Sequence, residues 1–96
     1  MRKRLKDLAA LVEGAEIAGD PQTVITDIVQ DSRQVSRGAM FVALAGVHVD
    51  GHTFIFAAAA KGAAAVLTET ETTVPPGMAV LRVPCMKTAL SIIVPA

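Results

Sequence analysis

An almost unbroken apolar run, Met40 to Ala45, most constrains how this chain can fold. The run has the length of a typical strand, follows Gly38 and offers no polar face to water. A strand of this kind is expected where helices cover both faces of a sheet. Ala64 to Thr68 and Met78 to Val83 are similarly short and apolar, so we expect two more buried strands there.

Helical patterns lie between and beside these runs. Apolar residues recur at helical spacing from Leu5, which predicts a short helix that ends near Gly14. A second helix is expected from Thr53 to Lys61, where consecutive alanines suggest close packing on a sheet. A third is expected after Pro84, where helical spacing resumes.

Two weaker segments, Ala15 to Ala18 and Val24 to Gln30, complete the predicted strands. Strands that alternate with helices favour a sheet covered by helices. No repeat or long linker divides the sequence. The sequence therefore predicts the α/β class, with a single small domain over residues 1–96 and a sheet of about five strands with helices packed on its faces.

Charge and composition exclude several classes of partner. Nine Lys and Arg balance nine Asp and Glu, so no broad electric field would attract nucleic acid. The apolar stretch Leu8 to Val12 is shorter than the roughly 7 to 15 residues of an export signal, and no run reaches the roughly 20 residues that span a bilayer. We therefore expect a cytoplasmic protein with no nucleic-acid and no membrane partner.

Cys85 is the single cysteine. An intramolecular disulfide and a zinc site built from several cysteines are therefore excluded. We expect Cys85 to be a buried small apolar residue.

Ligands of such sheets usually bind in loops beyond the carboxyl ends of strands, here residues 30–38 and 46–52. In the first loop, Asp31, Ser32 and Arg33 place a carboxylate, a hydroxyl and a guanidinium on consecutive residues. Ser and Arg are suited to phosphate and ribose oxygens. The alternative is a local turn in which Asp31 and Ser32 satisfy backbone groups and Arg33 pairs with Asp31. A structural role suits Asp31 better than phosphate contact, because its charge repels phosphate.

The second loop runs from Gly46 to His52. Its glycines allow close backbone approach to a flat polar ring such as uracil, on which His48 could stack or form a hydrogen bond. His48 could equally be an exposed loop residue, and His52 could cap the next helix or pair with Asp50. Metal binding is not favoured, because the spacing is not that of helical zinc motifs.

The rest of the sequence contains no recognisable catalytic set. It lacks the phosphate loop of nucleotide hydrolases and the nucleophile elbow of hydrolases, and Lys61 is interpreted as a solvated helix end. The residues alone therefore indicate a small α/β binding domain. The sequence stops at Ala96 without a cap or polar tail, from which we expect a longer natural protein.

One ordered set of motifs resembles a known family. In sequence order they are D-S-R at 31–33, G-A-M-F-V-A-L at 38–44, G at 46, D-G-H at 50–52, F-I at 54–55 and G-A at 62–63. This string resembles the N-terminal domain of the Mur ligases. The opening R-L-K-D-L-A-A-L, G-D-P at 19–21 and the terminal K-T-A-L are most similar to the MurE branch. The alternatives are the MurF branch, which shares the central string, and a stand-alone nucleotide-binding module without enzymatic activity.

The resemblance implies part of an ATP-dependent peptide ligase with three domains. That enzyme would join UDP-N-acetylmuramoyl-L-alanyl-D-glutamate to meso-diaminopimelate or L-lysine during peptidoglycan synthesis. This chain would be the domain that binds the uridine diphosphate end of the substrate. The central ATPase domain, with its ATP and magnesium, and the C-terminal domain have no counterpart here. The chain alone is therefore expected to hold no cofactor, metal or catalytic residue and to be inactive.

The resemblance also assigns roles within the two loops. Ser32 matches the serine that contacts the UDP-sugar, and Gln30 takes the neighbouring position at the end of a strand. The segment that lies along the uridine matches Val47, His48 and Val49. Residues expected to shape the pocket, and ranked second, are Asp31, Arg33, Gly46, Asp50 and Gly51.

Overall fold

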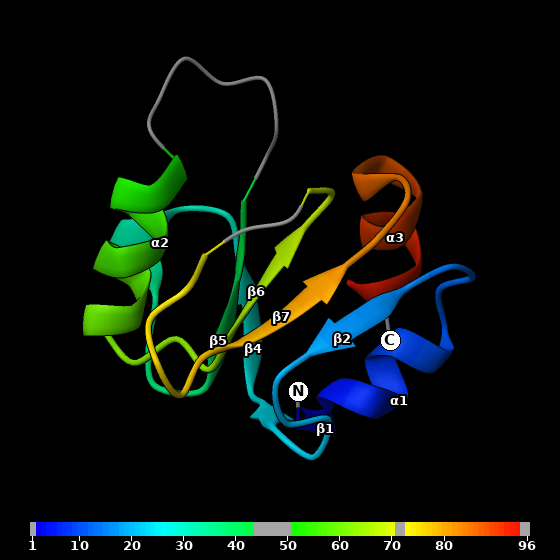
Figure 1. Cartoon of the computed structure of the whole chain (residues 1–96), viewed down its shortest axis with the longest axis horizontal. Coiled ribbons are helices and arrows are strands. Elements are labelled where there is room, and N and C mark those ends of the chain that lie inside the picture. The colour runs from blue at the N-terminus through cyan, green and yellow to red at the C-terminus, as the bar shows by residue number, and fades with distance from the viewer. Residues whose placement is uncertain (1, 44–50, 71–72, 95–96) are drawn as a thin grey trace.

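A five-stranded sheet forms the centre of the fold in a computed structural model that describes residues 2–43, 51–70 and 73–94. The strand order is β2-β7-β6-β5-β4 (Figure 1). Neighbouring strands from β4 to β7 run parallel, and β2 pairs antiparallel with β7 at one edge. The strands of this sheet are β2 Glu16–Ala18, β4 Asp27–Val29, β5 Ala39–Val42, β6 Ala65–Thr68 and β7 Ala79–Arg82.

Helices cover both faces of this sheet. Helices α1, Leu5–Ala10, and α3, Met86–Ile93, lie on one side, and α2, Gly51–Ala60, lies on the other (Figure 1). A short 3-10 helix, η1, spans Ser32–Gln34 in the connection from β4 to β5. It packs against α2. The predicted α/β class, with about five strands and helices on both faces, is confirmed.

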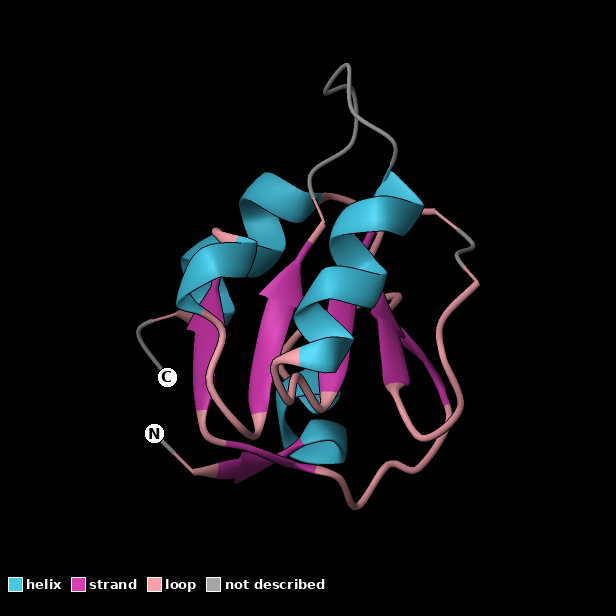
Figure 2. Cartoon of the chain, turned by 90° about the vertical axis from the view of Figure 1, so that its left-hand side faces the viewer, coloured by secondary structure: helices cyan, strands magenta, loops and turns pink. Residues whose placement is uncertain are grey.

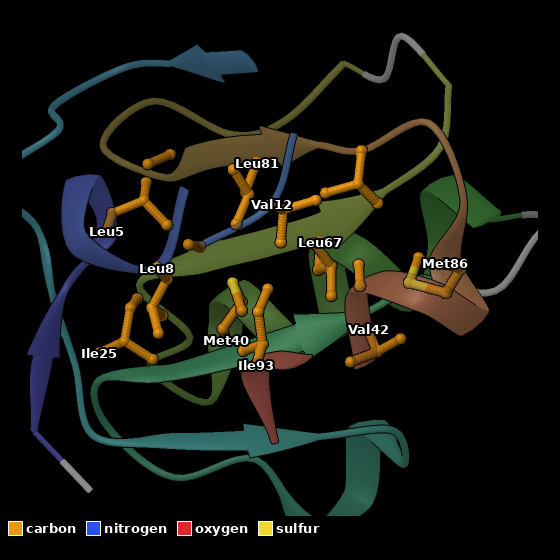
Figure 3. Close-up of a cluster of buried hydrophobic side chains, with 14 residues drawn as sticks. Leu5, Leu8, Val12, Ile25, Met40, Val42, Leu67, Leu81, Met86 and Ile93 are labelled. Atoms are coloured by element: carbon orange, nitrogen blue, oxygen red, sulfur yellow. The ribbon is translucent and has the colours of Figure 1, made fainter. Parts of the chain in front are cut away.

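Alternation along the central strands divides the core in two. In β5, Met40 and Val42 face α1 and α3, whereas Ala39 and Phe41 face α2. Strands β6 and β7 alternate in the same way, because successive side chains of a strand point to opposite faces. Figure 3 shows the larger cluster, which consists of Leu5, Leu8, Val12, Ile25, Met40, Val42, Ala65, Leu67, Ala79, Leu81, Val83, Met86, Ala89 and Ile93.

The segment Val24 to Gln30 differs from the single strand that its sequence predicts. It is broken at Thr26 into β3, Val24–Ile25, and β4. The Thr26 N–H donates to the Gly38 carbonyl oxygen at 2.9 Å, and its hydroxyl donates to the Arg37 carbonyl oxygen at 3.1 Å. Gly38 has φ +87°, and a Cβ there would lie 2.8 Å from the Thr26 hydroxyl, so the close approach requires glycine.

The break lets the chain form a second, small sheet. Strand β3 pairs antiparallel with β1, Lys3–Arg4, which the sequence did not predict. Two consecutive basic residues carry no apolar alternation, so no periodic signal marks them as a strand. In Figure 2 this two-stranded ribbon lies below the main sheet.

The buried central strands should dominate stability. Leu67 in β6 is fully buried, whereas Leu11 after α1 is 45% exposed. Leu67→Ala removes apolar contacts and leaves a cavity, so we expect it to lower the free energy of unfolding by about 2 to 5 kcal/mol. Leu11→Ala, the matched control, should change it by less than about 0.5 kcal/mol. Urea denaturation measures both values. If the two variants lost the same free energy of unfolding, the assignment of the core would be contradicted.

Candidate functional site

The connections that follow the parallel strands gather at one edge of the sheet. Strands β4, β5, β6 and β7 share one direction, so their carboxyl ends meet at this edge, which we call the carboxyl edge. The arrowheads of β6 and β7 point toward the end of the molecule at which α2 and α3 begin (Figure 1). Loops at such an edge are the usual place for a ligand. The residues predicted to bind substrate therefore follow strands that end there.

Asp31 and Arg33 form a closed local pair. Asp31 Oδ1 accepts hydrogen bonds from the Arg33 backbone N–H at 2.9 Å and from Arg33 Nε at 3.1 Å. Asp31 Oδ2 accepts a further bond from Arg33 Nη2 at 2.8 Å. The carboxylate thus holds the turn that begins η1, as the local-turn alternative expects for these two residues. The Arg33 side chain remains 84% exposed, so its guanidinium is held in place while facing solvent.

The pair shifts the acidity of Asp31. Hydrogen bonds from the Arg33 side chain and backbone lower the pKa of Asp31 to about 2, and the positive charge of Lys61 contributes in the same direction. The same hydrogen bond raises the pKa of Arg33. Lys61 is exposed just after α2, as the sequence predicts for a solvated helix end. Asp31 is therefore a carboxylate throughout the neutral range and offsets part of the positive charge of Arg33.

The structure brings the first predicted loop next to α2. Gln30 is exposed directly after β4, and Ser32 begins η1, which packs against α2. Gly51 is the first residue of α2. The remaining predicted residues, Gly46, Val47, His48, Val49 and Asp50, lie outside the described residues, as do the side chains of Ser32 and His52. The roles assigned to all of these residues stay predictions.

A carboxylate from another loop closes the start of α3. The Met86 backbone N–H donates to Glu69 Oε2 at 2.6 Å, although the two residues are 17 positions apart. A helix N-terminus attracts anions, so Glu69 takes a position that a phosphate could otherwise occupy, and its charge repels one. The start of α3 is therefore an unfavourable place for a phosphate. Sequence reasoning missed Glu69, because a cap supplied from a distant loop leaves no local pattern.

The prediction that Cys85 is buried is wrong. Cys85 is exposed in the turn before α3, where the buried face of the helix begins only with Met86. Hydrogen bonds with the side chain and backbone of Thr88 lower the pKa of the Cys85 thiol, and the negative charge of Glu69 opposes this effect.

Neither a metal centre nor a membrane span is found in the described part of the chain. Over residues 2–43, 51–70 and 73–94, no three His, Cys, Asp or Glu side chains gather as metal ligands would. No helix within the same ranges combines the length and apolar character that crossing a bilayer requires.

Comparison with known proteins links this fold to one family. The profile described as "Mur ligase family, catalytic domain" matches residues 24–96. A UDP-N-acetylmuramoyl-L-alanyl-D-glutamate–2,6-diaminopimelate ligase of Geobacter sulfurreducens is 46% identical over 88 residues, which cover 92% of this chain and 17% of that protein. The Bacillus licheniformis ligase of the same name is 44% identical over 69 residues, or 72% of this chain and 14% of that protein. The chain therefore spans less than a fifth of the length of these relatives.

Solved structures give the same family. Two crystal structures of MurF from Acinetobacter baumannii superpose with TM-scores of 0.76 and 0.78, at 28% and 27% identity. They match 94% and 97% of this chain, and the matched region is 20% of each MurF chain.

The Asp31–Arg33 pair predicts a measurable titration. Because the folded pKa of Asp31 lies below its ordinary 3.8, the pair stabilises the fold above about pH 4, and this contribution is lost as pH falls through about 2. Arg33→Gln removes the side-chain bonds, so the pKa of Asp31 should rise toward 3.8. NMR titration of the carboxyl carbon measures it. Arg37→Gln is the control and should leave it unchanged, and an unmoved pKa in Arg33→Gln would refute the pairing.

Proposed function

Because the chain belongs to the Mur ligase family, we propose that it binds the uridine diphosphate end of UDP-N-acetylmuramoyl-L-alanyl-D-glutamate at its carboxyl edge. The sequence relatives are ligases named for this substrate, and their similarity to the chain carries the proposal. The parallel sheet supports it, since its carboxyl edge gathers the loop from Gln30 to Arg33 and the start of α2. Sequence identity favours the MurE-type ligases over MurF, whose structures share the fold at lower identity.

Within this site we assign the phosphate end of the ligand to the β4 side. The Ser32 hydroxyl would donate to a phosphate or ribose oxygen, with Gln30 beside it. Arg33 would supply positive charge from a fixed position, reduced by its bond to Asp31. Glu69 disfavours phosphate at the start of α3, which supports the same half of the edge. Asp31 then acts as a support for Arg33.

We assign the uracil to the segment from Gly46 to Gly51. There Val47 and Val49 would give apolar contacts and backbone hydrogen bonds, and His48 would be the polar side chain that reads the base. Gly46, Asp50 and Gly51 would shape the backbone around it. These roles come from the family resemblance and from the loop composition.

The whole ligase is proposed to be a longer cytoplasmic enzyme that uses ATP and magnesium in peptidoglycan precursor synthesis. Its ATPase and amino-acid-binding domains would lie in the large part of the relatives that this chain does not span. The names of the relatives support 2,6-diaminopimelate as the added residue. This domain would bind the nucleotide end of the substrate, far from the reacting carboxylate. The energy of that binding would help to hold the carboxylate in position for the reaction.

Calorimetry on the 96-residue chain tests the proposal. We expect weak binding of the UDP-sugar substrate, competed away by UMP and UDP, and no ATP hydrolysis. Ser32→Ala should weaken binding about 10- to 100-fold, since a hydrogen bond to a charged oxygen contributes about 1.5 to 3 kcal/mol. It should leave the preference for UDP over CDP unchanged. His48→Ala should have the opposite effect. It should reduce the preference for UDP over CDP and leave the increase in affinity from UMP to UDP unchanged.

All affinities are compared at one salt concentration, because salt screens phosphate binding. The thermal midpoint serves as the folding control. If Ser32→Ala lowers the midpoint while affinity per folded molecule stays constant, Ser32 is only a turn residue. Equal losses for UMP, UDP and CDP in both variants would show that the site is divided wrongly, and ATP turnover by the chain would contradict a purely substrate-binding role.

A further inference from the structure

Helix α2 is apolar on its outer side as well as on its inner side. Ile55 and Ala58 are buried against the sheet, whereas Phe54 and Phe56 are 38% and 46% exposed. Ala57 and Ala60 are exposed as well. The alanines that suggested close packing on the sheet therefore lie partly on the side that faces away from it. Figure 2 views the molecule from this side.

This composition is unlike that of an ordinary surface helix. From Phe54 to Ala60, α2 has no polar side chain, whereas the exposed side of α3 carries Lys87, Thr88 and Ser91 beside Ile92. A helix that is apolar all round is normally covered on both sides. We call the exposed side chains of Phe54, Phe56, Ala57 and Ala60 the outer face of α2.

Three positively charged residues lie near α2, two of them at its C-terminal end. Lys61 follows the helix directly. Arg37 lies close to the end of the helix, because a Cβ added to the next residue, Gly62, would be 3.0 Å from Arg37 Cα. Arg33 projects from η1, which packs against α2. Residues 30–38 and 51–64 contain a single acid, Asp31, and its carboxylate is bonded to Arg33. A complementary partner would have an apolar centre and an acidic rim.

The exposed phenylalanine surface is small compared with a stable protein interface. At about 200 Å² for a whole phenylalanine side chain, the exposed parts of Phe54 and Phe56 offer together roughly 170 Å². A stable interface buries about 800 Å² on each partner. A partner on the same polypeptide needs far less area, because its effective concentration reaches the millimolar range.

The length of the relatives supplies such a partner. More than four fifths of the Geobacter sulfurreducens ligase has no counterpart in this chain. We propose that the outer face of α2 is the surface on which another domain of the longer ligase docks, through an apolar patch with an acidic rim. This inference rests on the proposal that the chain is part of such a ligase. It also accounts for two exposed phenylalanines on one helix, while Phe41 is buried.

Hydrogen exchange on the 96-residue chain and on the longer ligase that contains it tests this proposal. The α2 amides, Phe54 to Ala60, should exchange at least 10-fold more slowly in the longer protein. Phe56→Glu should abolish this difference, because it puts a charge among the apolar side chains of the outer face. Leu11→Glu, at an equally exposed apolar position on the opposite side of the sheet, is the matched control and should preserve it. In the short chain, neither variant should shift the thermal midpoint by more than a few degrees.

Equal α2 exchange in both proteins, or equal effects of Phe56→Glu and Leu11→Glu, would overturn the proposal. A dimer of the short chain in sedimentation at about 100 μM that Phe56→Glu makes monomeric would also overturn it, since the occupant would then be a second copy. UDP-sugar affinity of the short chain should be the same with and without Phe56→Glu. A failure of nucleotide binding is therefore distinguishable from a failure of docking.

Discussion

Burial of three neighbouring parallel strands on both faces is the constraint on which the rest of the structure depends. Side chains of β5, β6 and β7 alternate between two apolar clusters, so each face of the sheet needs a cover. Helices α1 and α3 supply one cover and α2 the other (Figure 1). Parallel strands also place their following loops at one edge. The same burial that stabilises the fold thus assembles the candidate site.

The sequence predicts the parts of the fold that this burial controls. The apolar runs at β5, β6 and β7 are strong signals because these strands are buried on both faces. The helical spacing before and after them marks the helix faces that pack on the sheet. Features set by contacts between distant segments were missed. Strand β1 is basic and exposed, and the break at Thr26 depends on hydrogen bonds to Arg37 and Gly38. Cys85 is exposed because it precedes the buried face of α3.

The candidate site was only partly predictable. Consecutive polar residues after β4 mark the loop that contains Ser32, but their pattern does not distinguish a ligand contact from a turn. The structure shows the turn for Asp31 and Arg33, and this leaves the role of Ser32 as a prediction. Glu69 caps the start of α3 from a position 17 residues earlier in the chain. The sequence of α2 is that of a buried helix, although Phe54 and Phe56 are exposed. Both depend on tertiary placement.

Binding of the uridine nucleotide at the β4, β5 and α2 half of the carboxyl edge is the central claim. It is tested most directly by titrating UDP-N-acetylmuramoyl-L-alanyl-D-glutamate into the isotope-labelled chain and following its backbone amides by NMR. We expect the largest shifts in Gln30 to Gln34, in Ala43 and in the first turn of α2. The ribbon of β1 and β3, below the main sheet, should hardly respond (Figure 2). Shifts concentrated in that ribbon, or at Glu69 and the start of α3, would contradict the account.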